Sequence, residues 1–145
     1  MKNYFPNKST STLQNKMLIQ PFFVDQRLKS KKIIKGMGSN YSWSQSDIIK
    51  GIEGDLKKGI KNFLLFLVPK EKQKLPEDFS FHYEVIRNLK QQFQNDITLL
   101  IDTCLCSITP DGHCGISHKK KIDLKQTHYA LGLAANTYLE AGADV

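Results

Sequence analysis

Apolar runs and amphipathic helical patterns alternate along the chain, and this alternation constrains the fold more than any other feature. Runs typical of buried strands cover residues 17–24, 62–68 and 96–105. Helical periodicity follows them over about 47–58, 81–93 and 124–140. Strand starts lie roughly 35–45 residues apart, which predicts a parallel sheet covered by helices. Residues 25–45, rich in glycine, serine and asparagine, are expected to form a loop.

This order fits either a doubly wound sheet or part of a (β/α)8 barrel. A complete barrel needs about 200 residues or more, and the chain has 145. Residues 143–145 have the character of a fourth strand's start, so we expect three βα units of a longer protein. Pro21, inside the first apolar run, indicates a strand start, an edge or a bulge.

All three cysteines, Cys104, Cys106 and Cys114, lie within 11 residues at the end of the third apolar run. In a strand, Cys104 and Cys106 would point to the same face because side chains alternate with a period of two. The following loop contains Pro110 and two glycines and can return Cys114 to their side. Three converging thiolates favour zinc and leave one coordination position open, which is typical of a catalytic site.

Other interpretations of this segment stay open. His113 could supply a fourth ligand and close the site, which would make it structural. The cysteines could also be three free buried thiols, since cysteine is often buried. Asp102 could orient a metal-bound water or a substrate amine, or it could pair with a lysine of a loop.

Charge and hydropathy exclude some functional classes. The net charge is +7, but the lysines are scattered and Arg27 and Arg87 are the only arginines, so we expect no nucleic-acid partner. The longest apolar run, residues 63–68, is far shorter than the roughly 20 residues of a membrane span. The first 11 residues are polar and lack the apolar core of a signal peptide, which predicts a cytoplasmic protein.

Residues 102–115 resemble a signature of the porphobilinogen synthase (delta-aminolevulinic acid dehydratase) family, Asp-x-Cys-Leu-Cys-x-x-Thr-x-x-Gly-His-Cys-Gly, at every fixed position. Met17 to Val24 resembles the family's first strand, Leu65 to Pro69 its second, and Ala141 to Val145 the lead into its fourth. The resemblance covers residues 13–145, and we expect residues 1–12 to form a flexible N-terminal arm.

The resemblance implies the N-terminal part of a (β/α)8 TIM barrel, in a family that usually assembles as homo-octamers. Its members are lyases that condense two molecules of 5-aminolevulinate into porphobilinogen in tetrapyrrole (heme) biosynthesis. By resemblance, Cys104, Cys106 and Cys114 are ligands of a catalytic Zn²⁺, and Asp102 matches an active-site aspartate. A second divalent ion such as Mg²⁺ occurs in some full-length members.

The chain also departs from the family. The Schiff-base lysines of the family lie on later strands, and none of the lysines here matches their motifs. The family's Ser-Met-Pro-Gly-x-x-Arg stretch appears as residues 36–42 without its proline and arginine, and the arginine-rich arm is absent. The alternative function is therefore that of a non-catalytic, truncated remnant or a metal-binding module.

Overall fold

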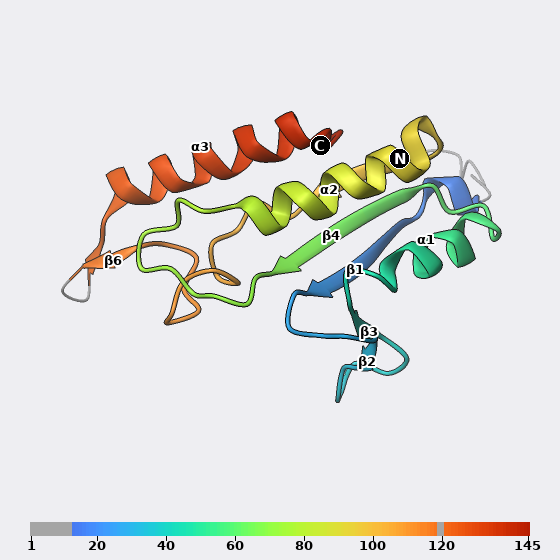
Figure 1. Ribbon diagram of the computed structural model, residues 1–145, viewed down its shortest axis with the longest axis horizontal. Helices are drawn as coiled ribbons and strands as arrows, with labels where there is room; N and C mark the ends of the chain where they lie inside the picture. The colour runs from blue at the N-terminus through green and yellow to red at the C-terminus, as the bar shows by residue number, and fades with distance from the viewer. Residues whose placement is uncertain (1–12, 119–120) are drawn as a thin grey trace, which may run out of the picture.

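The computed structural model describes residues 13–118 and 121–145, and the expected arm at residues 1–12 lies outside this range. The described chain is an α/β structure with one five-stranded sheet and a separate two-stranded hairpin (Figure 1). The larger sheet contains β1 (Ile19–Asp25), β2 (Lys32–Ile33), β3 (Tyr41–Trp43), β4 (Asn62–Val68) and β5 (Thr98–Ile101). The helices are α1 (Ile48–Leu56), α2 (Ser80–Phe93) and α3 (Leu124–Ala141). The hairpin pairs β6 (Ser117–His118) with β7 (Lys121–Ile122), and short 3₁₀ turns cover Asn15–Met17 and Gln94–Asp96.

Strand order in the sheet is β2-β3-β1-β4-β5, and β1, β3, β4 and β5 are mutually parallel. The chain after α3 continues this sheet, because the N–H of Val145 donates to Leu99 O and the N–H of Ile101 donates to Val145 O. This is the pattern of a parallel bridge, so the predicted start of a fourth strand is confirmed. Pro21 pairs with β4 on one side, while β3 reaches only Phe23 and Val24 on the other. The proline therefore lies where β1 is an edge, as expected.

Two details of the predicted element order were wrong. The expected loop at residues 25–45 contains β2 and β3, which pair antiparallel to each other, while β3 joins β1 in parallel. Tyr41 and Trp43 are good strand formers, but the run of three residues, Tyr41–Trp43, is too short to show a period. The third strand is also shorter than predicted, since it ends at Ile101 instead of residue 105.

The two faces of the sheet differ in burial. One face packs against the helices, and its side chains are at most 7% exposed: Phe22, Val24, Phe63, Leu65, Leu67, Leu99 and Ile101. The opposite face carries alternating side chains that are only half-buried, among them Phe23 and Phe66, whose rings stack at 4.9 Å. The alternation follows from the two-residue period of a strand. In a barrel these half-buried residues belong to the interior.

Each predicted helix is present within two residues of its expected bounds. Asp123 caps α3 by accepting the N–H of Gln126, and Gly142, with φ of 105°, ends it in the left-handed conformation. Asp47 occupies the N-cap position of α1 but its carboxylate accepts from the N–H of Lys31 instead. Among the described residues, no helix combines the length and apolarity that crossing a membrane requires.

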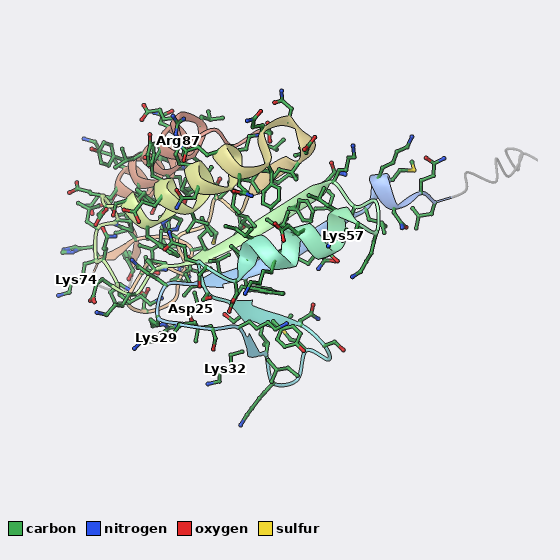
Figure 2. All side chains as sticks on the ribbon, turned by 45° about the vertical axis from the view of Figure 1, so that its right-hand side comes forward. Asp25, Lys29, Lys32, Lys57, Lys74 and Arg87 are labelled. Atoms are coloured by element: carbon green, nitrogen blue, oxygen red, sulfur yellow. The ribbon has the colours of Figure 1, made fainter. Side chains whose placement is uncertain are left out.

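Basic side chains lie over several elements. Figure 2 shows Lys29 and Lys32 near the β2 segment, and Lys57 at the end of α1 and Arg87 on α2 away from them. Arg27 is engaged in a bidentate ion pair, since its Nε and Nη2 donate to the Asp25 carboxylate at 2.8 and 2.6 Å. This pair lowers the pKa of the Asp25 carboxyl, against the opposing effect of partial burial.

Candidate metal centre

The three cysteines converge at the carboxyl ends of the parallel strands. We call residues 102–118, which follow β5, the cysteine loop; it lies at the end of the sheet toward which the β4 arrow points (Figure 1). The Sγ atom of Cys104 lies 3.4 Å from Sγ of Cys106 and 3.3 Å from Sγ of Cys114. All three sulfur atoms lie within 4.8 Å of one another. Because β5 has already ended, a turn rather than a strand brings Cys104 and Cys106 together.

This geometry fits a thiolate-bound metal ion. A tetrahedral Zn²⁺ with Zn–S bonds of about 2.3 Å needs sulfur atoms about 3.8 Å apart. The observed distances of 3.3 and 3.4 Å reach that value after shifts of a few tenths of an ångström. Cys104 and Cys106 are half-buried and Cys114 is exposed. An ion held by these three residues would therefore be reachable from solvent and would keep an open coordination position.

The thiols differ in acidity. Partial burial acts to raise the pKa of Cys104, but the backbone N–H of Cys106 and the thiols of Cys114 and Cys106 together bring it below its ordinary value. The pKa of Cys106 is raised to about 11, chiefly by its hydrogen bond with Cys104 and then by burial. The pKa of Cys114 is raised, mainly by its hydrogen bond with Cys104. One thiolate is thus stabilised by two neighbouring thiols, and a cation would be needed to deprotonate all three.

Asp102 lies at the end of β5, where its N–H donates to Leu65 O. Burial raises the pKa of its carboxyl, and its charge acts on Cys104, Cys114 and the buried Tyr138. Among the residues that the structure describes, no lysine forms an ion pair with it, so the alternative of a paired strand-end residue is not realised there. Its carboxylate thus stays available beside the cysteines.

His113 lies outside the group of ligand atoms. Its Nδ1 accepts the N–H of Gly115 at 3.1 Å, which leaves Nε2 as its free nitrogen. Within the described ranges, the cysteines form a cluster of possible ligands by themselves. The geometry therefore favours a three-cysteine centre over a closed site with four ligands.

The hydrogen bonds that shape the loop could not be predicted from the sequence, although Thr109 occupies a fixed position of the signature described above. Thr109 donates its hydroxyl to His113 O at 2.7 Å, and the Thr127 hydroxyl accepts the N–H of Ile116 at 2.9 Å. From the segment after β4, Lys72 Nζ donates to Ser107 O and the N–H of Gln73 donates to Ile108 O. Each is a common polar residue in a loop, and its partner is a backbone group, which leaves no compositional signal.

A buried aromatic cluster at the α2–α3 interface was also missed. His82 is 2% exposed and stacks on Tyr138 with ring centroids 5.5 Å apart, between Phe79 and Phe81. Its Nδ1 has no hydrogen-bond partner among the described residues. Burial lowers the pKa of His82 to about 4, against a smaller opposing effect of the Asp78 charge. The imidazole therefore behaves as a neutral core residue at pH 7.

The sequence is similar to members of one protein family. The sequence profile described as delta-aminolevulinic acid dehydratase matches residues 5–145. The delta-aminolevulinic acid dehydratase of Methanothermus sociabilis is 34% identical over 139 residues, which cover 93% of this chain and 43% of the relative. That of Ruminiclostridium josui is 33% identical over 137 residues, which cover 92% of this chain and 66% of the relative.

Structural comparison agrees. The crystal structure of the delta-aminolevulinic acid dehydratase (porphobilinogen synthase) of Toxoplasma gondii, in complex with the product porphobilinogen, superposes with a TM-score of 0.86 at 28% identity. The match covers 94% of this chain and 41% of that one. The chain thus spans about two-fifths of the length of several relatives that it matches, including the enzymes of M. sociabilis and Archaeoglobus fulgidus.

Proposed function

The chain belongs to the delta-aminolevulinic acid dehydratase family, and on that basis we propose that it provides the metal-binding part of a porphobilinogen synthase. Such an enzyme condenses two molecules of 5-aminolevulinate into porphobilinogen. The observation that carries the proposal is the convergence of three thiols beside Asp102 at the carboxyl end of a parallel sheet. Active sites of (β/α)8 barrels form at that end.

Cys104, Cys106 and Cys114 would hold Zn²⁺, which supplies Lewis-acid polarisation of a substrate oxygen or nitrogen when bound. Asp102, whose pKa is raised by burial, is suited to accept or return a proton at the substrate amine. The solvent-exposed position of Cys114 leaves space in front of the centre for the substrate to enter. Assembly into homo-oligomers and a cytoplasmic location remain part of this proposal.

The covalent steps of such an enzyme need a kind of lysine that the described residues do not offer. A Schiff-base lysine must be partly desolvated, so that its pKa falls and its amine can attack a carbonyl. Lys90 is the least exposed lysine among the described residues. Its side chain is 16% exposed, and its ammonium group is paired with Asp144. We propose that the Schiff-base lysines belong to a portion that corresponds to the later strands of the full-length relatives.

A metal-binding module without catalysis is the second candidate. It is favoured by the half-buried inner face of the sheet, which in this chain has no covering element among the described residues. Activity separates the two candidates. Porphobilinogen formation from 5-aminolevulinate is measured with the chain alone and after co-expression with the complementary later portion of the M. sociabilis relative. Zinc-dependent product from the pair, lost in Asp102→Asn, supports the enzyme; zinc binding without product under both conditions supports the module.

The metal centre has its own test. Purified chain is expected to bind one Zn²⁺ per molecule, as measured by elemental analysis and competition with a chromophoric chelator. Each of Cys104→Ser, Cys106→Ser and Cys114→Ser is expected to lower the affinity by at least about 100-fold, because serine is a poor ligand for zinc. His113→Gln should leave the affinity within a few-fold, as should the control His128→Gln on the exposed side of α3. An unchanged affinity in the three serine variants would contradict the proposed centre.

A further inference from the structure

The ligands of the proposed centre come from two arms of the cysteine loop. The first arm, residues 102–109, carries Cys104 and Cys106 and continues directly from β5. The second arm, residues 113–118, carries Cys114. A metal ion that contacts all three sulfur atoms therefore depends on how the two arms are held relative to each other.

The first arm is fixed to the rest of the fold. The N–H of Asp102 donates to Leu65 O, which extends the pairing of β4 with β5. Leu105 and Ile108 are fully buried, and the segment after β4 holds Ser107 O and Ile108 O through Lys72 and Gln73. The position of the first arm is therefore set by its contacts with the sheet and the core.

The second arm is exposed at His113 and Cys114, whereas Ile116 is buried and its N–H donates to the hydroxyl of Thr127 on α3. The other contacts of this arm are local. The N–H of His113 donates to Asp111, the hydroxyl of Ser117 donates to Asp111, and the N–H of Gly115 donates to His113 Nδ1. These bonds shape the second arm and the turn before it. They do not fix its distance from Cys104 and Cys106.

Thr109 connects the two arms. Its side chain is buried, with 3% exposure, and its Oγ1 lies 2.7 Å from His113 O and 3.2 Å from Leu105 O. Leu105 O already accepts the N–H groups of Ile108 and Thr109, at 2.9 and 2.8 Å. The single hydroxyl proton of Thr109 is therefore assigned to the hydrogen bond with His113 O, the carbonyl of the residue before Cys114. The hydrogen bond from Thr109 to His113 O joins the two arms directly. Among the described residues, it is the side-chain hydrogen bond that does so, apart from the contacts between the thiols.

We propose that Thr109 is a positioning residue of the metal centre, because its hydroxyl holds the carbonyl of His113 and thereby sets Cys114 beside Cys104 and Cys106. This inference rests on the proposed function, in which the three thiolates bind Zn²⁺. Without the hydroxyl, His113 O has no hydrogen-bond partner among the described residues, and the exposed part of the second arm can turn this carbonyl toward water. Cys114 then moves away from the other two sulfur atoms. Residues that orient metal ligands typically change metal affinity by about 10- to 100-fold when they are replaced.

Two variants at this position separate the hydroxyl from the packing of the side chain. Thr109→Val keeps the shape and removes the donor, whereas Thr109→Ser keeps the donor and removes the methyl group. Thr137→Val is the matched control, because Thr137 also donates its hydroxyl to a backbone carbonyl, Leu133 O at 2.9 Å, but lies on α3. All are made in the 145-residue chain.

The readouts are Zn²⁺ affinity by chelator competition and the absorption of the Co²⁺-loaded chain, whose sulfur-to-cobalt charge-transfer band reports the number of bound thiolates. Thr109→Val is expected to weaken Zn²⁺ binding by about 10- to 100-fold and to lose about one third of the charge-transfer intensity, as for two thiolates instead of three. Thr109→Ser and Thr137→Val should keep both values close to those of the parent chain. A role in stability alone would lower the melting temperature without changing the thiolate count.

The outcomes are distinguishable. If the parent chain binds neither Zn²⁺ nor Co²⁺, the proposed metal centre fails. If the parent chain binds both and Thr109→Val binds them equally well with full charge-transfer intensity, only the role of Thr109 is overturned. If Thr109→Val does not fold, Thr109→Ser still decides, because a weakened affinity in that variant would show that the methyl group and not the hydroxyl positions the arm.

Discussion

In the layer that the helices form with β1, β4 and β5, side chains such as Phe63, Leu65 and Leu99 are completely buried. In the cysteine loop, by contrast, the part that carries Cys114 is held mainly by directed hydrogen bonds: the Thr109 hydroxyl donates to His113 O, and the Thr127 hydroxyl accepts the N–H of Ile116. The layer gains its stability from the burial of many apolar atoms, each with a small contribution. The loop depends on a few directed contacts, each worth roughly 1 kcal/mol. The layer can therefore tolerate small losses, whereas the geometry of the loop changes when one contact is lost.

The largest expected effect tests whether the two faces of the sheet differ in their contribution to stability. Leu65→Ala, in the central strand and 0% exposed, is expected to lower the free energy of unfolding by about 3 to 5 kcal/mol through lost burial and a cavity. Its neighbour Leu64 points to the opposite, half-buried face, so Leu64→Ala should cost about 1 kcal/mol. Urea unfolding followed by circular dichroism measures both values. Equal losses at the two positions would show that both faces are packed alike in solution.

The next effect concerns pH and the buried imidazole in the layer. The pKa of His82 is about 4 in the folded chain and 6.5 when exposed. As the pH falls below 6.5, the unfolded chain takes up a proton that the folded chain resists, so stability is lost between pH 6.5 and 4. Above pH 6.5 both states are neutral and this contribution is complete. The shift corresponds to about 3 kcal/mol.

His82→Phe places a similar ring among Phe79, Phe81 and Tyr138 and removes the titrating group. The difference in free energy of unfolding between this variant and the parent should grow by about 3 kcal/mol as the pH is lowered from 7 to 4. His128→Gln, which changes an exposed histidine of α3, should show no such growth. A difference that stays constant with pH would mean that His82 is protonated without cost.

The smallest effect compares two glycines on one helix. A Cβ atom at Gly51 would lie 2.7 Å from the ring of Phe22 and 3.0 Å from that of Trp43, whereas a Cβ at Gly54 would meet nothing within 4 Å. Gly54→Ala is expected to stabilise the fold by about 0.5 to 1 kcal/mol, because alanine is the better helix former. Gly51→Ala is expected to destabilise it by about 1 kcal/mol, since overpacking outweighs the same gain. Thermal unfolding of the two variants gives the sign of each effect, and stabilisation by both would contradict the close contact of α1 with β1.

The same difference between the two regions explains what the sequence could predict. The strands at residues 19–25 and 62–68 follow from continuous apolar runs, and all three helices follow from amphipathic periodicity, because burial of one helix face requires apolar residues at a regular spacing. The grouping of Cys104, Cys106 and Cys114 was also predicted, from their spacing and from the resemblance to a family. The reason given for that grouping was partly wrong, since the strand ends at Ile101 and the cysteines lie on a turn.

The remaining features depend on contacts between distant segments. Nothing in the sequence pairs Thr109 with His113 O, or Gln73 with Ile108 O, because a backbone acceptor occurs at every residue. The strands at Lys32–Ile33 and Tyr41–Trp43 were missed because two or three residues cannot display an alternation. His82 was hidden for a different reason: an unpaired imidazole in an aromatic core departs from the usual preference for satisfied polar groups.

The order of the parallel strands has a consequence for the way the chain is made. β1, β4, β5 and the segment at residues 144–145 stand side by side in the order of their synthesis. A nascent chain that leaves the ribosome can therefore add β4, β5 and this last segment in turn to an edge that is already formed, while β3 takes its place between β1 and β2 on the other side of β1. Asp144, which accepts from Lys90 Nζ and from the N–H of Leu99, fixes the newest strand to α2 and β5. Growth from one edge keeps each search for a partner short and limits the time for which an unpaired strand is open to aggregation.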